Sequence, residues 1–151
     1  MRTTLIRRVA LAGLLYATPI LAQTGSPNTT PIGVTRVTLL RVNRDHGPAF
    51  WQDVRQHLKP IYEEYKRRGI ITNYAFETKL SSNSENDWNV VLAVTYPNYA
   101  ALDNLTTRTD PVTLAHYGSP EKRTAANQER VKHATVVQSF LLRNVSVNDW
   151  K

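Results

Sequence analysis

The chain has 151 residues, a net charge of +7 and no cysteine. This length suits one domain, and the lack of cysteine excludes disulfide bonds, a thiolate nucleophile and thiolate-bound metal. The basic residues are scattered apart from residues 66–68, a predicted helix C-terminus, where the helix dipole favours cations. No basic patch is interleaved with aromatic residues, so we predict no nucleic-acid partner.

Residues 1–22 are predicted to be a secretory signal peptide. Arg2, Arg7 and Arg8 precede an apolar run at residues 9–22, which is shorter than the ~20 residues that a membrane-spanning helix needs. We therefore expect cleavage after Ala22, a periplasmic or secreted protein and no stable membrane span. Cleavage leaves 16 basic residues (19 minus three) against 12 acidic ones, a net charge of +4. Residues 23–33 are rich in Pro, Gly, Ser, Thr and Asn, which is typical of a flexible leader.

The predicted domain spans residues 34–144 and begins with a strand at residues 34–43. A helix is predicted over residues 48–68, where apolar side chains recur at intervals of four, four, three and four: Phe50, Val54, Leu58, Ile61 and Tyr65. Pro60 lies inside this pattern and lacks an amide hydrogen, so we expect a kink at residues 56–59. Gly69 is expected to end the helix.

Two strands, at residues 70–80 and 87–97, are expected to follow. The first has one polar face and is expected at a sheet edge, whereas the second is β-branched and apolar on both faces, as central strands are. Two or three short helices are predicted between residues 99 and 132, because Asp110-Pro111 and Ser119-Pro120 each resemble an N-cap followed by proline at the first helical position. A last strand is predicted at residues 132–144, followed by a tail at residues 145–151.

The predicted order β-α-β-β-α(α)-β belongs to the α+β class and is that of the ferredoxin-like split βαβ fold, in which the first and third strands are central. Strand alternation predicts a row of large side chains on the sheet face away from the helices: Leu39, Tyr74, Phe76, Trp88, Val90, Leu92, Val94, Tyr96, Val136 and Phe140. An uncovered apolar face of this kind indicates an interface, and a two-fold related copy would cover it with its own sheet. We therefore predict a homodimer.

In this element order and strand patterning, residues 34–144 resemble the dimeric α/β-barrel superfamily, and distantly the small antibiotic-biosynthesis-type monooxygenases. The resemblance implies a barrel built by two ferredoxin-like subunits. Side chains assigned to the barrel interior, with Tyr117 near its mouth, are candidate contacts of a small-molecule ligand: Arg41, Tyr74, Trp88, Tyr96, Tyr117 and Gln138. Hydrogen bonds across the dimer that fix its register are an equal explanation for Arg41, Asn43 and Gln138.

Some members of this superfamily degrade haem with an Asn from the first strand, a Trp, and a His from the second helical region. Asn43 and His116 resemble this Asn and His and are the candidate catalytic residues, but Leu105 stands near the position of the Trp. Because this motif is incomplete, we predict no cofactor, with haem as the alternative. The four histidines lack the spacing of metal ligands, so we predict no metal.

Three functions are consistent with the sequence. The preferred hypothesis is an exported homodimer that binds a small apolar or aromatic molecule, because no complete catalytic set is visible. The second is a cofactor-independent or haem-using monooxygenase, and the third is a structural or interaction module with a solid core.

Overall fold

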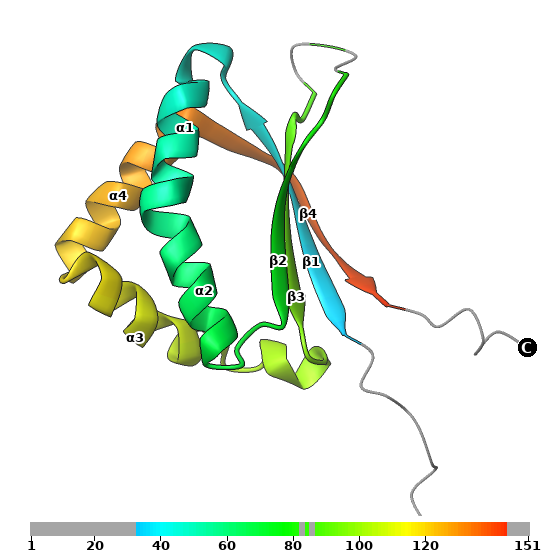
Figure 1. Cartoon of the computed structure of the whole chain (residues 1–151), viewed down its shortest axis with the longest axis vertical. Coiled ribbons are helices and arrows are strands. Elements are labelled where there is room, and N and C mark those ends of the chain that lie inside the picture. The colour runs from blue at the N-terminus through cyan, green and yellow to red at the C-terminus, as the bar shows by residue number, and fades with distance from the viewer. Residues whose placement is uncertain (1–32, 82–83, 85–86, 145–151) are drawn as a thin grey trace, which may run out of the picture.

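The computed structural model describes residues 33–81, 84 and 87–144. The predicted signal peptide, residues 23–32 of the leader and the tail at residues 145–151 lie outside this part of the chain. The predicted element order is confirmed: a four-stranded antiparallel sheet carries the helices on one face (Figure 1). The strands are β1 (Val34–Val42), β2 (Asn73–Thr78), β3 (Val90–Tyr96) and β4 (Ala134–Arg143). They are arranged β2-β3-β1-β4, so β1 and β3 are central and β2 is an edge strand, as predicted.

The predicted helix at residues 48–68 is a rod of three parts: α1 (Gly47–Asp53), the π-helical turn η2 (Val54–Leu58) and α2 (Lys59–Arg67). The irregularity expected near Pro60 is present, as a widened turn. Pro60 has no amide hydrogen to offer one turn back, and the Lys59 N–H instead reaches the carbonyl of Val54 five residues earlier. Gly69, with φ of 65°, follows the rod as predicted.

The second helical region contains the 3-10 turn η3 (Tyr99–Leu102), α3 (Leu105–Tyr117) and α4 (Pro120–His133). The predicted start of α4 is confirmed, because the Ser119 hydroxyl accepts a hydrogen bond from the Lys122 N–H at 3.3 Å. The helix start predicted at Asp110-Pro111 is wrong, since Pro111 lies inside α3. Continuing the helix through Pro111 buries Val112 in the core, which offsets the one hydrogen bond that the proline removes.

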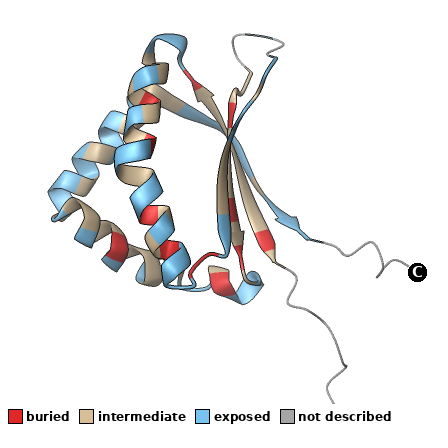
Figure 2. Ribbon diagram, viewed as in Figure 1, coloured by how far each residue is buried: buried red, intermediate tan, exposed pale blue. Residues whose placement is uncertain are grey.

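The core lies between the rod and the sheet, and buried positions follow this contact in Figure 2. One cluster packs Ile61 and Tyr65 of α2 against Val94 of β3. A second cluster packs Phe50 and Val54 against Val42 and Val90, at the end of the sheet where β1 finishes and β3 begins. The rod therefore covers mainly β2, β3 and β1, while β4 is exposed along most of its length.

The predicted grouping of large side chains on one sheet face is wrong. Residues paired across neighbouring strands point to the same face, and the register pairs Leu39 with Val91 and Leu40 with Val90. The row from Val90 to Tyr96, together with Tyr74 and Phe76, therefore faces the helices, whereas Leu39 and Phe140 face away from them. A register shift opposite Leu39/Leu40 also puts Val136 on the helix side, because a β-bulge reverses the alternation of β4.

The face without helices, here called the open face, is nevertheless apolar at its centre. Its members follow from the strand register: Thr35, Val37, Leu39, Arg41, Asn73, Ala75, Glu77, Val91, Ala93, Thr95, Thr135, Gln138, Phe140 and Leu142. Leu142 is 49% exposed. No described segment packs over this face in Figure 1, so an apolar surface of the predicted kind exists, but only Leu39 and Phe140 of the predicted row belong to it.

Candidate functional site

The predicted ligand-binding residues do not converge on one site. Arg41 and Gln138 lie on the open face, and Tyr74 and Tyr96 lie on the helix side. Tyr74 donates to a Glu63 carboxylate oxygen at 2.7 Å, and Tyr96 is 5% exposed beneath the Arg36 guanidinium.

Trp88 and Asn43 lie at the end of the sheet where β1 leads into α1. The ammonium group of Lys79 sits 4.6 Å from the centre of the Trp88 ring. Asn43 is exposed and lines a hollow with Trp51 and Lys79. His116 lies elsewhere, in a groove between α2 and α3 with Pro60 and Val112. Asn43 and His116 therefore do not form the joint site that the haem-degrading motif implies.

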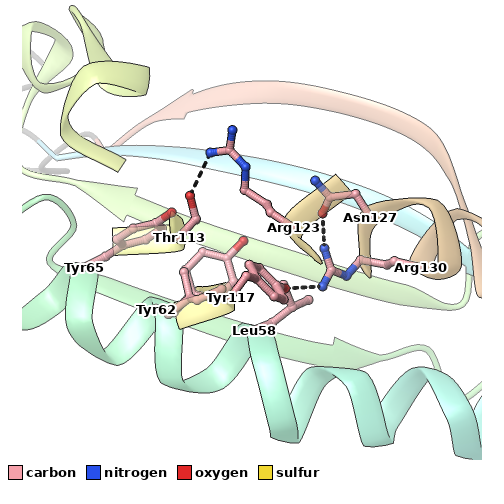
Figure 3. A pocket seen from close by; sticks show the side chains of 9 residues that line it. Leu58, Tyr62, Tyr65, Thr113, Tyr117, Arg123, Asn127 and Arg130 are labelled. Atoms are coloured by element: carbon pink, nitrogen blue, oxygen red, sulfur yellow. Dashed lines mark hydrogen bonds between the residues drawn. The ribbon is translucent and has the colours of Figure 1, made fainter. Parts of the chain in front are cut away.

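A different set of residues lines a half-open cavity of about 110 Å³ between α2, α3 and α4 (Figure 3). Its lining combines aliphatic side chains, three tyrosines and a polar stripe on α4: Leu58, Ile61, Tyr62, Tyr65, Thr113, Tyr117, Arg123, Asn127 and Arg130. Tyr117 is the predicted ligand-binding residue that lies here. The site thus has an apolar lining with a few convergent polar groups, the usual composition of a small-molecule site.

Arg130 is the electrostatic centre of this cavity. Its guanidinium donates to both carboxylate oxygens of Asp53 on α1, at 2.7 and 3.1 Å. It also donates to the side-chain oxygen of Asn127 at 2.8 Å and to the phenol oxygen of Tyr117 at 2.9 Å. Because the side chains of Arg130 and Asp53 are only 21% and 15% exposed, this bidentate pair is well shielded from water. It fixes Tyr117 at the cavity wall.

Arg123 brings a second cation to the same cavity. Its Nη1 donates to Asp110 at 3.0 Å and to the Thr113 hydroxyl at 3.2 Å. Figure 3 shows Arg123 on the opposite side of the cavity from Leu58. The spacing of Arg123, Asn127 and Arg130 is four and three, which places them on one side of α4.

The tyrosines give the cavity a rigid aromatic wall. Tyr62 stacks on Tyr74 with a centroid separation of 5.1 Å and an interplanar angle of 25°, and it meets Tyr65 edge-on. Burial raises the pKa of Tyr62 and raises that of Tyr65 to about 12. Both phenols therefore stay protonated at neutral pH and can act as hydrogen-bond donors.

A histidine pair borders this cavity. The Nδ1 atom of His57, in the π-helical turn, lies 3.0 Å from the Nε2 atom of His116 on α3. Both imidazoles contact the Tyr117 ring, with centroid separations of 5.3 and 4.9 Å. Burial, with the nearby His57 and Arg130, lowers the pKa of His116, so its neutral form is favoured at pH 7.

Haem does not fit the groove that His116 lines. This groove has a volume of about 220 Å³, below the ~300–1,000 Å³ typical of pockets for drug-sized ligands. Within the described residues, no group of three or more His, Asp or Glu side chains has an arrangement that could hold a metal ion. No helix of the described part of the chain is long and apolar enough to cross a membrane.

Most of this cavity is not indicated by local sequence patterns. Tyr62 lies outside the apolar stripe of the rod, and Arg123 and Arg130 belong to no motif. The four-three spacing of Arg123, Asn127 and Arg130 was a signal that could have found them, since it gives an otherwise polar helix one distinct face. The partner of Arg130, Asp53, lies 77 residues away in sequence, and no local pattern indicates that contact.

Comparison with solved structures supports the fold assignment. HapK from Hahella chejuensis is 13% identical and aligns with a TM-score of 0.51, covering 75% of this chain and 93% of its own. A conserved protein from Methanosarcina mazei is 11% identical, with a TM-score of 0.49 and coverage of 77% and 96%. A dimeric ferredoxin-like protein from an uncultured marine organism is 7% identical, with a TM-score of 0.49 and coverage of 80% and 92%.

No protein-family model matches this sequence, and no curated protein does. The strand order β2-β3-β1-β4, with the helices on one face of the sheet, is that of the ferredoxin-like fold. The chain is therefore an α+β protein of the ferredoxin-like fold, as the sequence predicted. At these levels of identity the likeness concerns the fold alone.

Proposed function

We propose that this protein is an exported homodimer that binds a small aromatic molecule in the cavity between α2, α3 and α4. The observation that carries the proposal is the convergence of three tyrosines and two arginines on one cavity. Aromatic walls with a few fixed polar groups favour a flat ligand held in one orientation. The preferred location is thus within each subunit, between its helices, and not between two sheets.

The size of the cavity limits the ligand to one ring at most. Its volume of about 110 Å³ is below the ~150 Å³ that accommodates benzene in another protein, so part of a bound ring and its substituents would extend through the open side of the cavity. The phenol of Tyr117 accepts its hydrogen bond from Arg130, which leaves its own proton to donate to a ligand oxygen. Together with the positive charge of Arg123, this favours a monocyclic aromatic compound with an acidic or hydroxyl substituent.

Binding is tested by NMR titration of the isotope-labelled mature chain with benzoate, 4-hydroxybenzoate and cyclohexanecarboxylate. We expect saturable shifts of α2, α3 and α4 amides with the two aromatic acids, and weaker ones with the saturated acid. Arg123→Gln should weaken binding of both aromatic acids at least tenfold. Lys122→Gln, at an exposed position of the same helix, is the matched control for lost charge. Shifts confined to other elements, or equal effects of both variants, would refute this site.

The open face supports the homodimer part of the proposal. Apolar side chains from β1, β3 and β4 meet at its centre, among them Val37, Val91 and Phe140. A second copy of the chain is the occupant that we propose, because the face is apolar at its centre and a two-fold axis would bury it against the same face of the partner. Export rests on residues 1–22 and would be tested by N-terminal sequencing of the secreted chain.

One observation favours an enzyme as the second candidate. The neutral form of His116 is favoured, its ring contacts Tyr117 of the cavity wall, and a neutral histidine is the usual general base near pH 7. A cofactor-independent monooxygenase would use it to deprotonate a phenolic substrate. Oxygen uptake with 4-hydroxybenzoate or a dihydroxybenzoate that is lost in His116→Gln, with binding retained, would support this candidate over a pure binding protein.

A further inference from the structure

The four histidines of this chain form two pairs. His46 and His133 approach through their Nδ1 atoms at 2.9 Å, and His57 and His116 approach at 3.0 Å. These two pairs include all four histidines of the sequence, although the partners of each pair lie far apart along the chain. Two separate contacts of the same unusual type indicate a common physical role.

Both pairs bridge the same two parts of the molecule. His46 ends the turn η1 (Arg44–His46) before α1, and His133 ends α4. His57 lies in the middle of the rod, and His116 lies in the last turn of α3. Each pair therefore joins the α1–α2 rod to the α3–α4 hairpin, on whose boundary the cavity lies.

The geometry identifies the pairs as hydrogen bonds between rings. The ring centroids lie 5.2 and 5.3 Å apart. For N···N distances of 2.9 and 3.0 Å, these are close to the largest centroid separations possible. In each pair the two nitrogens therefore lie between the rings and point directly at each other. A chelated metal ion would instead require both lone pairs to converge on a third point. One nitrogen of each pair must carry a proton and the other must offer its lone pair.

We propose that these pairs make the attachment of the α3–α4 hairpin to the rod proton-dependent, so that acidification from pH 7.5 to 5.5 loosens this boundary and opens the cavity. A pair with one ring proton at the contact keeps its hydrogen bond. When both rings are fully protonated, two N–H groups and two positive charges face each other, and the contact becomes repulsive. The proposal concerns the attachment itself and does not depend on the cavity having a ligand.

The charged neighbours make the two pairs unequal. Glu129, itself bound to Lys132, lies 3.7 Å from the Nε2 atom of His133 and stabilises a positive charge on that pair; Asp45 adjoins His46 in sequence.

The other pair faces the Arg130 cation, which opposes protonation of His116. Glu64 lines the same groove but is neutralised by Arg67 and Arg68. We therefore expect the His57–His116 contact to give way first.

The sign of the effect follows from proton linkage. The pKa of His116 is lowered in the closed arrangement, so the opened arrangement binds more protons. The attachment is therefore fully stable above the ordinary histidine pKa of ~6.5 and weakens as the pH falls below it. The shielded Arg130–Asp53 pair, with its two hydrogen bonds, also joins the hairpin to the rod and limits the movement to a loosening.

Hydroxyl-radical footprinting of the full mature chain at pH 7.5 and 5.5 tests the opening. We expect oxidation of Tyr65 and Tyr117 to increase about threefold at pH 5.5, while Tyr99, which is 53% exposed on η3, serves as the unchanged reference. The His46→Gln/His57→Gln double variant keeps hydrogen-bonding groups but cannot place two charges in contact, so its Tyr65 and Tyr117 should stay protected. No increase in the wild type, or the same increase in the double variant, would overturn the proposal.

A histidine NMR titration gives a second test, which measures the coupling between the paired rings directly and not the opening of the cavity. In the wild type, His116 should titrate below the ordinary range, and in His57→Gln it should titrate at a higher pH because one facing charge is gone. Independent titration of all four rings near pH 6.5, unaffected by the partner's removal, would contradict the coupling on which the proposal rests.

Discussion

At the scale of single residues, Arg130 organises the helical layer. Its guanidinium joins three helices, through Asp53 on α1, Tyr117 on α3 and Asn127 on its own α4. A shielded cation is unfavourable unless its charge and its donors are matched. The contacts of Arg130 match both, which is why a charged residue can line the cavity.

Asp53→Asn is predicted to lower the free energy of unfolding by about 2 kcal/mol, because it leaves the shielded guanidinium without its counter-charge. Urea denaturation at pH 7.5 measures this loss. The comparison is Glu129→Gln, whose carboxylate forms an exposed ion pair with Lys132 and whose loss should have no measurable effect. Equal stability of the two variants would mean that the Asp53–Arg130 pair does not hold the helices together.

Asn89 completes the end of β1 with its side chain. Its amide oxygen accepts from the Val42 N–H and its amide nitrogen donates to the Val42 carbonyl, both at 2.8 Å. Asn89→Ala leaves both backbone groups unpaired and should cost about 1–2 kcal/mol of stability. Asn73→Ala, at the exposed start of β2, is the matched change and should be nearly neutral in the same denaturation experiment.

At the scale of elements, the π-helical turn sets the direction of His57. The extra residue in the turn at Val54–Leu58 rotates the side chains that follow it relative to a regular α-helix, and His57 lies within it opposite His116. Pro60 maintains the turn because it cannot supply the amide hydrogen of a regular helix. The irregular turn thus allows the contact between His57 and His116 at the boundary of the cavity.

Pro60→Ala should change the free energy of unfolding by less than about 1 kcal/mol, because Pro60 is exposed and alanine favours the helix. It should nevertheless weaken the His57–His116 contact if the turn relaxes to a regular helix. The histidine NMR titration reports this as a rise in the pH at which His116 titrates. An unchanged His116 titration would show that the turn persists without the proline.

Element types were predictable because they depend on local patterns. The stripe from Phe50 to Tyr65, the cap at Ser119 and the β-branched run of β3 each specify their structure within a few residues. The start of α3 was not predictable in this way. Asp110-Pro111 has the local signature of a helix start, but burial of Val112, a tertiary effect, favours a longer helix through it.

At the scale of the whole molecule, the sequence could not specify which strand faces coincide. Both rows of β1 and β3 are apolar enough to be buried, so the pairing of Leu39 with Val91 could not be chosen from alternation alone. The bulge in β4 also reversed the alternation of that strand, so that Val136 and Phe140 lie on opposite faces of the sheet. The cavity was equally inaccessible, because Asp53, Tyr117 and Arg130 meet only through the packing of three helices.

The open face gives a prediction about assembly. Leu39→Glu places a charge at its centre, opposite Val91, and should convert a dimer into a monomer at micromolar concentration because the charge would be buried without a partner. Sedimentation velocity measures the outcome. Leu80→Glu, at a fully exposed position, should leave the dimer intact. A dimer that tolerates Leu39→Glu would place the interface elsewhere.

Native mass spectrometry of the chain recovered from its own export route tests whether the protein is a homodimer that carries a ligand. We expect a dimer of mature chains with a reproducible additional mass of a single-ring organic compound, up to one per subunit, which is reduced in Arg123→Gln. A bare monomer, or a dimer without added mass that also fails to take up 4-hydroxybenzoate, would contradict the proposed homodimeric binding protein.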